Sequence, residues 1–165
     1  MFSDIKNKIP TFLSHVFIKR QQSTYFEKVK STLDNETLCL QVDFSENFKM
    51  DIQDAIQNSY YSKNSVSLFT SYVWYSNGGQ SFVYVSNNLT HDKFCISTIL
   101  DHLFFKLKTQ FQNLKQIHIF SDGAAQQFKQ RFLFRNLCRL AEQFQVHSHV
   151  AFLSKFYFVS LGRFV

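Results

Sequence analysis

The stretch KQIHIFSDGAAQQFKQRF (Lys115–Phe132) changes character near its centre. The apolar run at residues 117–120 is typical of a buried strand. It ends at Ser121-Asp122-Gly123, and a polar, helix-prone segment follows. We therefore expect a strand that ends at this junction and is followed by a helix at residues 124–144. Asp122 stands at this junction, where it could cap the helix or, because strand ends in α/β sheets carry functional groups, belong to a site.

The segment before this junction predicts a meander of three strands. Residues 37–44 (TLCLQVDF) alternate with a period of two, which places Asp43 on the less apolar face near the strand's end. Residues 65–75 and 80–86 are rich in β-formers, and the SNGGQ link between them predicts a hairpin. Residues 45–64 are expected to form a polar connection with one helical turn.

Helices and a last strand complete the expected order. A helix is expected at residues 11–33, with Pro10 just before its start. Residues 91–114 show a helical apolar face, and Asp92 is placed to cap it. Residues 146–154 read as the last strand. The order predicts an α/β domain: a three-stranded meander, then helix-strand-helix-strand, in one mixed sheet with helices on its faces.

Composition narrows the class of protein. The chain has 165 residues, enough for one domain with a core, and 18 Lys and Arg outnumber 12 Asp and Glu. This basic surplus favours anionic partners, nucleic acid first. Three distant cysteines without a CxxC pair argue against a disulfide framework or zinc cluster and for an intracellular, reducing compartment. No 18-residue uncharged apolar run or signal-peptide pattern occurs, so no membrane association is expected.

Asp43 and Asp122 each end a predicted strand. If those strands are parallel neighbours, they lie about 4.8 Å apart and both carboxylates emerge at one edge of the sheet. Such anions repel unless a cation lies between them, and a third carboxylate would complete a two-metal site for phosphodiester chemistry. The alternative for Asp122 is a helix cap. Ala125 cannot complete a capping box with it, which weakens that alternative.

Several stretches resemble a group of transposon-derived animal proteins. These are LQVDFSENF (40–48), QDAIQ (53–57), IHIFSDGAAQQFKQRFLFRNLC (117–138) and FLSHVFIKRQQSTYF (12–26). The resemblance implies a DDE-type, RNase H-like transposase core similar to retroviral integrases, in residues 37–165, preceded by a helical segment at 1–36. It also implies that Asp43 and Asp122 are the first two catalytic, metal-binding carboxylates, holding Mg²⁺ or Mn²⁺.

The end of the chain departs from that family's pattern. Such cores need a third acidic residue after the fifth strand, whereas no Asp or Glu follows Glu142 here. The tail SKFYFVSLGRFV (154–165) reads like a truncated or frame-shifted end, so we expect this chain to be inactive alone. Glu46 is the next candidate metal ligand, with an exposed turn residue as the alternative; Asn47 could support either role.

The second expected helix carries a candidate DNA-contacting surface. Arg131, Arg135 and Arg139 recur every four residues, and Phe128 and Phe132 lie in the same sector. Basic residues interleaved with aromatics suit backbone contact plus base stacking. The alternative is a solvated face whose two Phe are covered by neighbouring chain.

His147 and His149 share one face of the last strand, a spacing that can hold a metal, but no Cys or acidic partner lies near them in sequence. Ordinary sheet histidines are the alternative.

The sequence thus favours a nucleic-acid-handling domain derived from a DDE-type transposase. If active, it would cut or transfer DNA strands with Mg²⁺ or Mn²⁺. The alternatives are a non-enzymatic DNA-binding remnant and a structural or interaction domain in which both aspartates are caps. A nuclear location would fit the DNA-handling interpretation.

Overall fold

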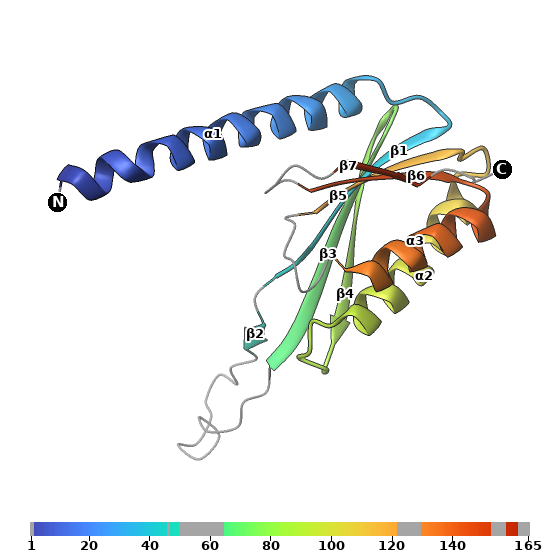
Figure 1. Cartoon of the computed structure of the whole chain (residues 1–165). Helices are drawn as coiled ribbons and strands as arrows, with labels where there is room; N and C mark the ends of the chain where they lie inside the picture. Colours follow the sequence, from blue (N-terminus) through green and yellow to red (C-terminus); the bar gives the residue numbers. More distant parts are fainter. Residues whose placement is uncertain (1, 46, 50–64, 122–129, 153–157, 162–165) are drawn as a thin grey trace, which may run out of the picture.

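The computed structural model describes residues 2–45, 47–49, 65–121, 130–152 and 158–161, and these form an α/β domain (Figure 1). The strands are β1 (Thr37–Phe44), β2 (Phe48–Lys49), β3 (Ser65–Tyr75), β4 (Gly78–Ser86), β5 (Gln116–Ser121), β6 (His147–Phe152) and β7 (Phe158–Leu161). The helices are α1 (Phe2–Ser31), α2 (Lys93–Gln110) and α3 (Arg131–Phe144). None of the described helices is long and apolar enough to cross a membrane.

The strands form one mixed sheet in the order β2-β3-β1-β5-β6-β7, with β4 paired to β3. β3 runs antiparallel to both β1 and β4, which confirms the expected meander. β5 lies parallel to β1 and to β6, and β7 returns antiparallel to β6. Helix α2 leads from β4 to β5 and α3 leads from β5 to β6, so each helix joins two strands that run in the same direction.

The meander closes in a two-residue link, Ser76-Asn77, because Tyr75 pairs directly with Gly78. Gly78 has φ +156°, a conformation that side chains rarely adopt, so glycine is required there. The predicted hairpin is therefore confirmed, with β4 beginning two residues earlier than expected.

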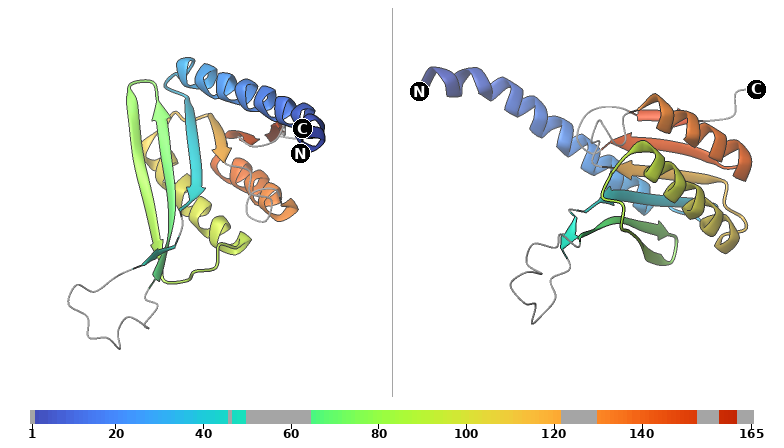
Figure 2. Two further views of the ribbon diagram at one scale, coloured as in Figure 1. Left: turned by 90° about the vertical axis from the view of Figure 1, so that its left-hand side faces the viewer. Right: turned by 90° about the horizontal axis from the view of Figure 1, so that it is seen from below.

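The main core lies between the sheet and the pair α2 and α3, which cover one face (Figure 2). The even-numbered apolar positions of β1, Leu38, Leu40 and Val42, are buried in it, as the alternation predicted. The apolar face expected for residues 91–114 also packs there, although α2 ends at Gln110. The described parts of α2 and α3 contact each other as well as the sheet.

A smaller cluster forms on the opposite face, where the last third of α1 packs. Phe26 contacts Phe120 and Trp74 edge-on, with ring centroids 4.8 and 5.2 Å apart. Val29 and Cys39 are buried in the same cluster. This contact fixes the end of α1 to the middle of the sheet.

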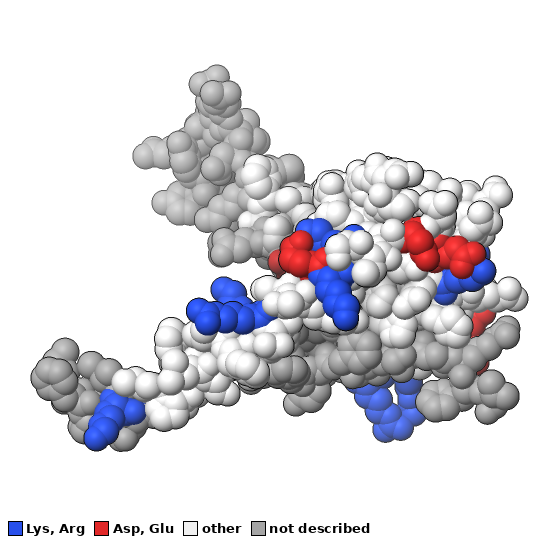
Figure 3. All heavy atoms as spheres, turned by 90° about the horizontal axis from the view of Figure 1, so that it is seen from above, with Lys and Arg blue, Asp and Glu red and all other residues white. Residues whose placement is uncertain are grey.

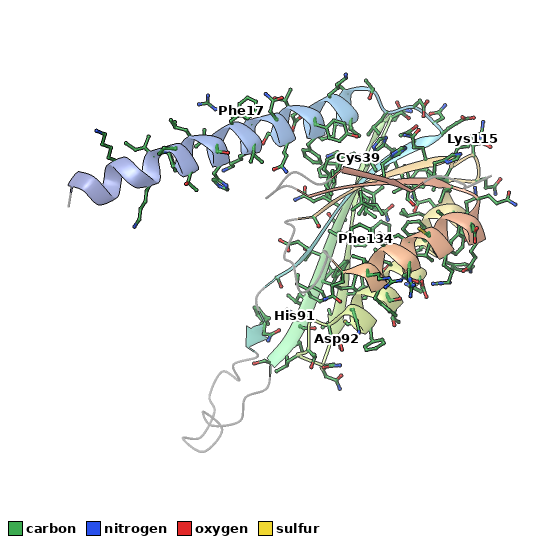
Figure 4. The ribbon with its side chains drawn as sticks, viewed as in Figure 1. Phe17, Cys39, His91, Asp92, Lys115 and Phe134 are labelled. Carbon is green, nitrogen blue, oxygen red and sulfur yellow. The ribbon has the colours of Figure 1, made fainter. Side chains whose placement is uncertain are left out.

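The earlier part of α1 stands away from the sheet (Figures 1 and 3). Phe12, Leu13 and Phe17 are each about three-fifths exposed, and Phe17 points into solvent in Figure 4. On the face seen in Figure 3, basic side chains lie along this projecting part, and acidic ones lie nearer the sheet. Residues 5–26 contain four Lys or Arg and no Asp or Glu.

Two further differences from the sequence-based expectation lie in the first helix and in the connection after β1. The first helix does not begin after Pro10: α1 starts at Phe2 and includes Pro10 in its interior. Proline removes one backbone hydrogen bond there at a cost of about 3 kcal/mol, and the remaining turns of a 30-residue helix are kept. The polar connection after β1 contains the short strand β2, which pairs with the start of β3.

The expected helix at residues 124–144 is shorter in its described part. Gln130 has extended backbone angles, φ −122° and ψ 140°, and α3 begins only at Arg131. The prediction of an uninterrupted helix from residue 124 is therefore wrong. Helix propensity alone suggested the earlier start, and it is a weak predictor that tertiary context overrides.

Candidate functional site

The strand ends at β1 and β5 are the centre of the candidate site. These strands are parallel neighbours, and their last paired residues are Val42 and Ser121. Both are buried, at 2% and 1% exposure. In the sequence each directly precedes an aspartate, Asp43 and Asp122. The expectation that the strands carrying these aspartates are adjacent and parallel is thus confirmed for the strands themselves.

Asp43 is exposed on the sheet face opposite α2 and α3. Its antiparallel partner is Thr70 of β3, whose hydroxyl donates to the Asp43 carbonyl oxygen at 3.3 Å. This contact and the pairing with β3 position the backbone of Asp43 near the end of β1. A carboxylate is the kind of oxygen donor that binds a divalent cation, and this one lies at an exposed position.

Asp122, Glu46 and Phe128 lie outside the described residues. Among the residues that the structure does describe, no group of three or more His, Cys, Asp or Glu could hold a metal. The cap position of α3 is occupied by Gln130, eight residues after Asp122. Asp122 is therefore not the N-cap of α3. The alternative in which Asp122 caps this helix is thus wrong.

The end of β1 is tied to the start of α2 through His91. Its ring stacks on Phe44 with centroids 4.3 Å apart, and its Nε2 lies 2.9 Å from Asn47 Oδ1 (Figure 4). Asp92 follows and caps α2, since its Oδ1 accepts from the backbone N–H groups of Phe94 and Cys95. The cap confirms the prediction. His91 was missed, because a single loop histidine has no periodic pattern.

The three arginines of α3 differ in their contacts. Arg139 forms an ion pair with Asp101 of α2 and donates to Asn136 Oδ1 and Gln143 Oε1. Within the described part of the chain, Arg131 and Arg135 form no ion pair. The opposite side of α3 carries the buried Leu133, Leu137 and Leu140. Two of the three arginines are thus available to an anionic ligand.

Phe132 is 38% exposed and packs edge-on against Phe94 of α2, with ring centroids 5.4 Å apart. Lys93 Nζ lies 5.5 Å from the Phe132 centroid and 5.1 Å from that of Phe94. No sequence pattern singles out Lys93 and Phe94, because they lie off the apolar face of α2 and far from Phe132 along the chain. Only the packing of α2 on α3 brings them together.

The histidines of β6 lie in different surroundings. His147 is exposed, whereas His149 is half-buried and stacks on His118 of β5. Burial lowers the pKa of His118 to about 4, with a smaller effect from His149. Cys39, the register partner of His118 on β1, has a pKa raised to about 12 by burial. No metal-binding group forms around these residues within the described ranges, which favours the sheet-histidine alternative.

Comparison with known proteins gives one match. Residues 22–156 match the model of a family described as Domain of unknown function (DUF8701). Neither a curated protein nor a solved structure matches the chain. The matched segment runs from the part of α1 that packs on the sheet to just beyond β6, well over half of the sequence. The chain therefore belongs to the DUF8701 family.

Proposed function

We propose that this chain is a nucleic-acid-handling domain with an RNase H-like sheet, derived from a DDE-type transposase. The single observation that carries the proposal is the parallel pairing of β1 with β5. The last residues that it pairs are Val42 and Ser121, and the residue that follows each in the sequence is an aspartate. A β4-β3-β1-β5-β6 arrangement with an antiparallel meander and parallel later strands supports the RNase H-like assignment.

Asp43 and Asp122 are the proposed metal ligands. Carboxylate oxygens are the donors that Mg²⁺ and Mn²⁺ prefer, and the exposed position of Asp43 at a strand end suits such a site. A divalent cation bound there would supply Lewis acidity at a phosphodiester. The protein's part is to fix the Asp43 carboxylate, through the pairing of β1 with β3 and β5, beside the path of the nucleic-acid backbone.

Arg131 and Arg135 are the proposed phosphate contacts. Neither is engaged by an acidic side chain in the described ranges, so their charge is available to a phosphate. Arg139 differs from them, because it already forms an ion pair with Asp101. We expect Arg139 to stabilise the contact of α3 with α2 more than to bind DNA.

Thermal unfolding with Mn²⁺ tests the metal site. Millimolar Mn²⁺ should raise the melting temperature, because a ligand of the folded state stabilises it by mass action. The response should vanish in Asp43→Asn and in Asp122→Asn. Asp34→Asn, in the turn before β1, is the matched control and should keep it. An undiminished response in Asp43→Asn would refute the proposed ligand set.

The salt dependence of DNA affinity tests the arginines. The log–log slope should flatten by about 0.9 for each phosphate contact that a substitution removes, so by about 2 in the Arg131→Gln, Arg135→Gln double variant. Arg139→Gln alone should leave the slope nearly unchanged. If the double variant keeps the wild-type slope, these arginines are only a solvated face.

Non-enzymatic binding is the second candidate function. It is favoured by the exposed side chains of Arg131 and Arg135, which could contact phosphates without any metal site. We accordingly propose that the chain alone nicks DNA little or not at all. Metal-dependent nicking that Asp43→Ala abolishes would contradict this, and Glu46 would then be the first candidate for a third ligand.

A further inference from the structure

Phe94 and Phe132 form an exposed aromatic pair between the first turns of α2 and α3. The two rings meet edge-on at 63°, and the two residues are 59% and 38% exposed. Each is the second residue of its helix, and neither belongs to the buried core. Their mutual contact removes only part of their apolar surface from water. Part of each aromatic side chain therefore remains exposed to solvent.

Cations surround this aromatic pair. Lys93 reaches over both rings, at 5.1 and 5.5 Å. Arg131 precedes Phe132 in the chain, and Arg135 lies one turn further along α3. The neighbouring carboxylate, Asp92, is engaged by the two backbone N–H groups that it caps. Among the described residues near the pair, three cations thus outnumber one carboxylate, which is complementary to an anionic ligand.

We propose that Phe94 and Phe132 stack on an unpaired nucleobase while Lys93, Arg131 and Arg135 contact the adjacent phosphates, so that the chain prefers single-stranded to duplex DNA. This inference rests on the proposed nucleic-acid function and names its substrate class. Aromatic side chains bind single strands by stacking, since every base offers a π-face. In a duplex the base faces are covered by their neighbours, so an exposed ring can use them only at an unpaired position.

A purely structural role of Phe94 and Phe132 predicts a different effect of truncating them. If the aromatic pair only holds α2 against α3, its truncation should lower stability and leave DNA affinity unchanged. If it stacks on a base, truncation should lower single-strand affinity specifically. Phe105 offers a matched control, because it is a phenylalanine of the same helix with nearly the same exposure, 61%.

The experiment compares the full chain's affinity for a fluorescent oligothymidine with its affinity for a blunt-ended duplex, by anisotropy at one fixed salt concentration. Wild type should bind the single strand more tightly. Phe94→Ala should weaken single-strand binding by about 5- to 150-fold, as for one stacked base, and duplex binding by less than about 2-fold. Phe105→Ala should change neither affinity, and Phe94→Trp should restore single-strand binding.

Phe94→Leu separates stacking from packing. Leucine keeps apolar volume between α2 and α3, so the melting temperature should hold while single-strand affinity stays low. Equal affinity of wild type for single strand and duplex, or unchanged single-strand binding by Phe94→Ala, would overturn this inference and leave the metal and arginine proposals standing. Failure of wild type to bind either DNA would overturn the nucleic-acid function as well.

Discussion

His118 and His149 stack face to face across two neighbouring parallel strands, with ring centroids 4.8 Å apart and planes 17° from parallel. They are register partners on β5 and β6, so the sheet itself sets their separation. Burial lowers the pKa of both rings, and each is lowered further by a neighbouring histidine. The folded protein therefore holds the pair neutral.

This pair predicts acid sensitivity. In the folded state the pKa of His118 is about 4, against 6.5 for the ordinary side chain, so the unfolded chain binds more protons between these values. Stability from a neutral His118 is fully present above pH 6.5, falls as the pH drops toward 4, and is absent below it. Urea unfolding at about pH 7.5, 5.5 and 3.5, values that bracket this range, measures the effect.

His118→Phe should flatten that pH dependence, because phenylalanine can stack on His149 without binding a proton. His15→Gln, at an exposed position on the projecting part of α1, is the control and should keep the wild-type slope. An equal slope in wild type and His118→Phe would mean that other groups cause the acid destabilisation.

The cap of α2 gives a second prediction. Asp92→Ala should cost about 1 kcal/mol of unfolding free energy, because two backbone N–H groups would then have no acceptor. Asp92→Asn should cost much less, since asparagine caps about as well as aspartate. Denaturant titration of the three proteins provides the measurement, and a large destabilisation in Asp92→Asn would point to a role for the charge instead.

The cysteines give a third prediction, in thiol reactivity. Cys39 is fully buried with a pKa raised to about 12, so almost no thiolate is present near neutral pH. Cys95 and Cys138 are only half-buried. A thiol reagent should therefore label Cys95 and Cys138 in the native protein and Cys39 only after unfolding. Rapid native labelling at Cys39, located by peptide mapping, would show that α1 separates readily from the sheet.

The ion pair between Arg139 and Asp101 gives a fourth prediction. Because both side chains are nearly half exposed, a double-mutant cycle with Arg139→Gln and Asp101→Asn should give a coupling of about 0.2–1 kcal/mol. The coupling should shrink in high salt. Arg135→Gln with Asp101→Asn serves as the uncoupled control. Zero coupling for Arg139 would mean that its charge is as available to DNA as the charges of the other two arginines.

Local patterns predicted the elements better than the contacts between them. The alternation in β1 predicted correctly that Leu40 lies in the main core and Cys39 on the other face. The predicted start of α3 was wrong. The polar segment before this helix has helical propensity, and the spacing of its polar and apolar residues does not mark Gln130 as extended. Propensity is a property of neighbours along the chain, whereas a helix start also depends on what packs against it.

The residues of the candidate site also differ in how far local sequence patterns could predict them. Strand-end Asp43 was found from the alternation along β1, which is local information. The contacts of Arg139 with Asp101 and of Phe132 with Phe94 join residues that are distant in the sequence, across two helices. Helical spacing says which residues share a face, but it does not say which face meets another helix.

The projecting part of α1 is a long helical segment that is attached to the sheet at one end only among the described contacts, so it has the geometry of a lever arm (Figure 1). Residues 2–21 span about 30 Å at about 1.5 Å per residue, so a rotation of about 10° at the anchor would move the far end by about 5 Å. The fulcrum is the contact of Phe26 with Trp74 and Phe120. A small repacking of these three rings would thereby displace the far end by about the spacing between two strands.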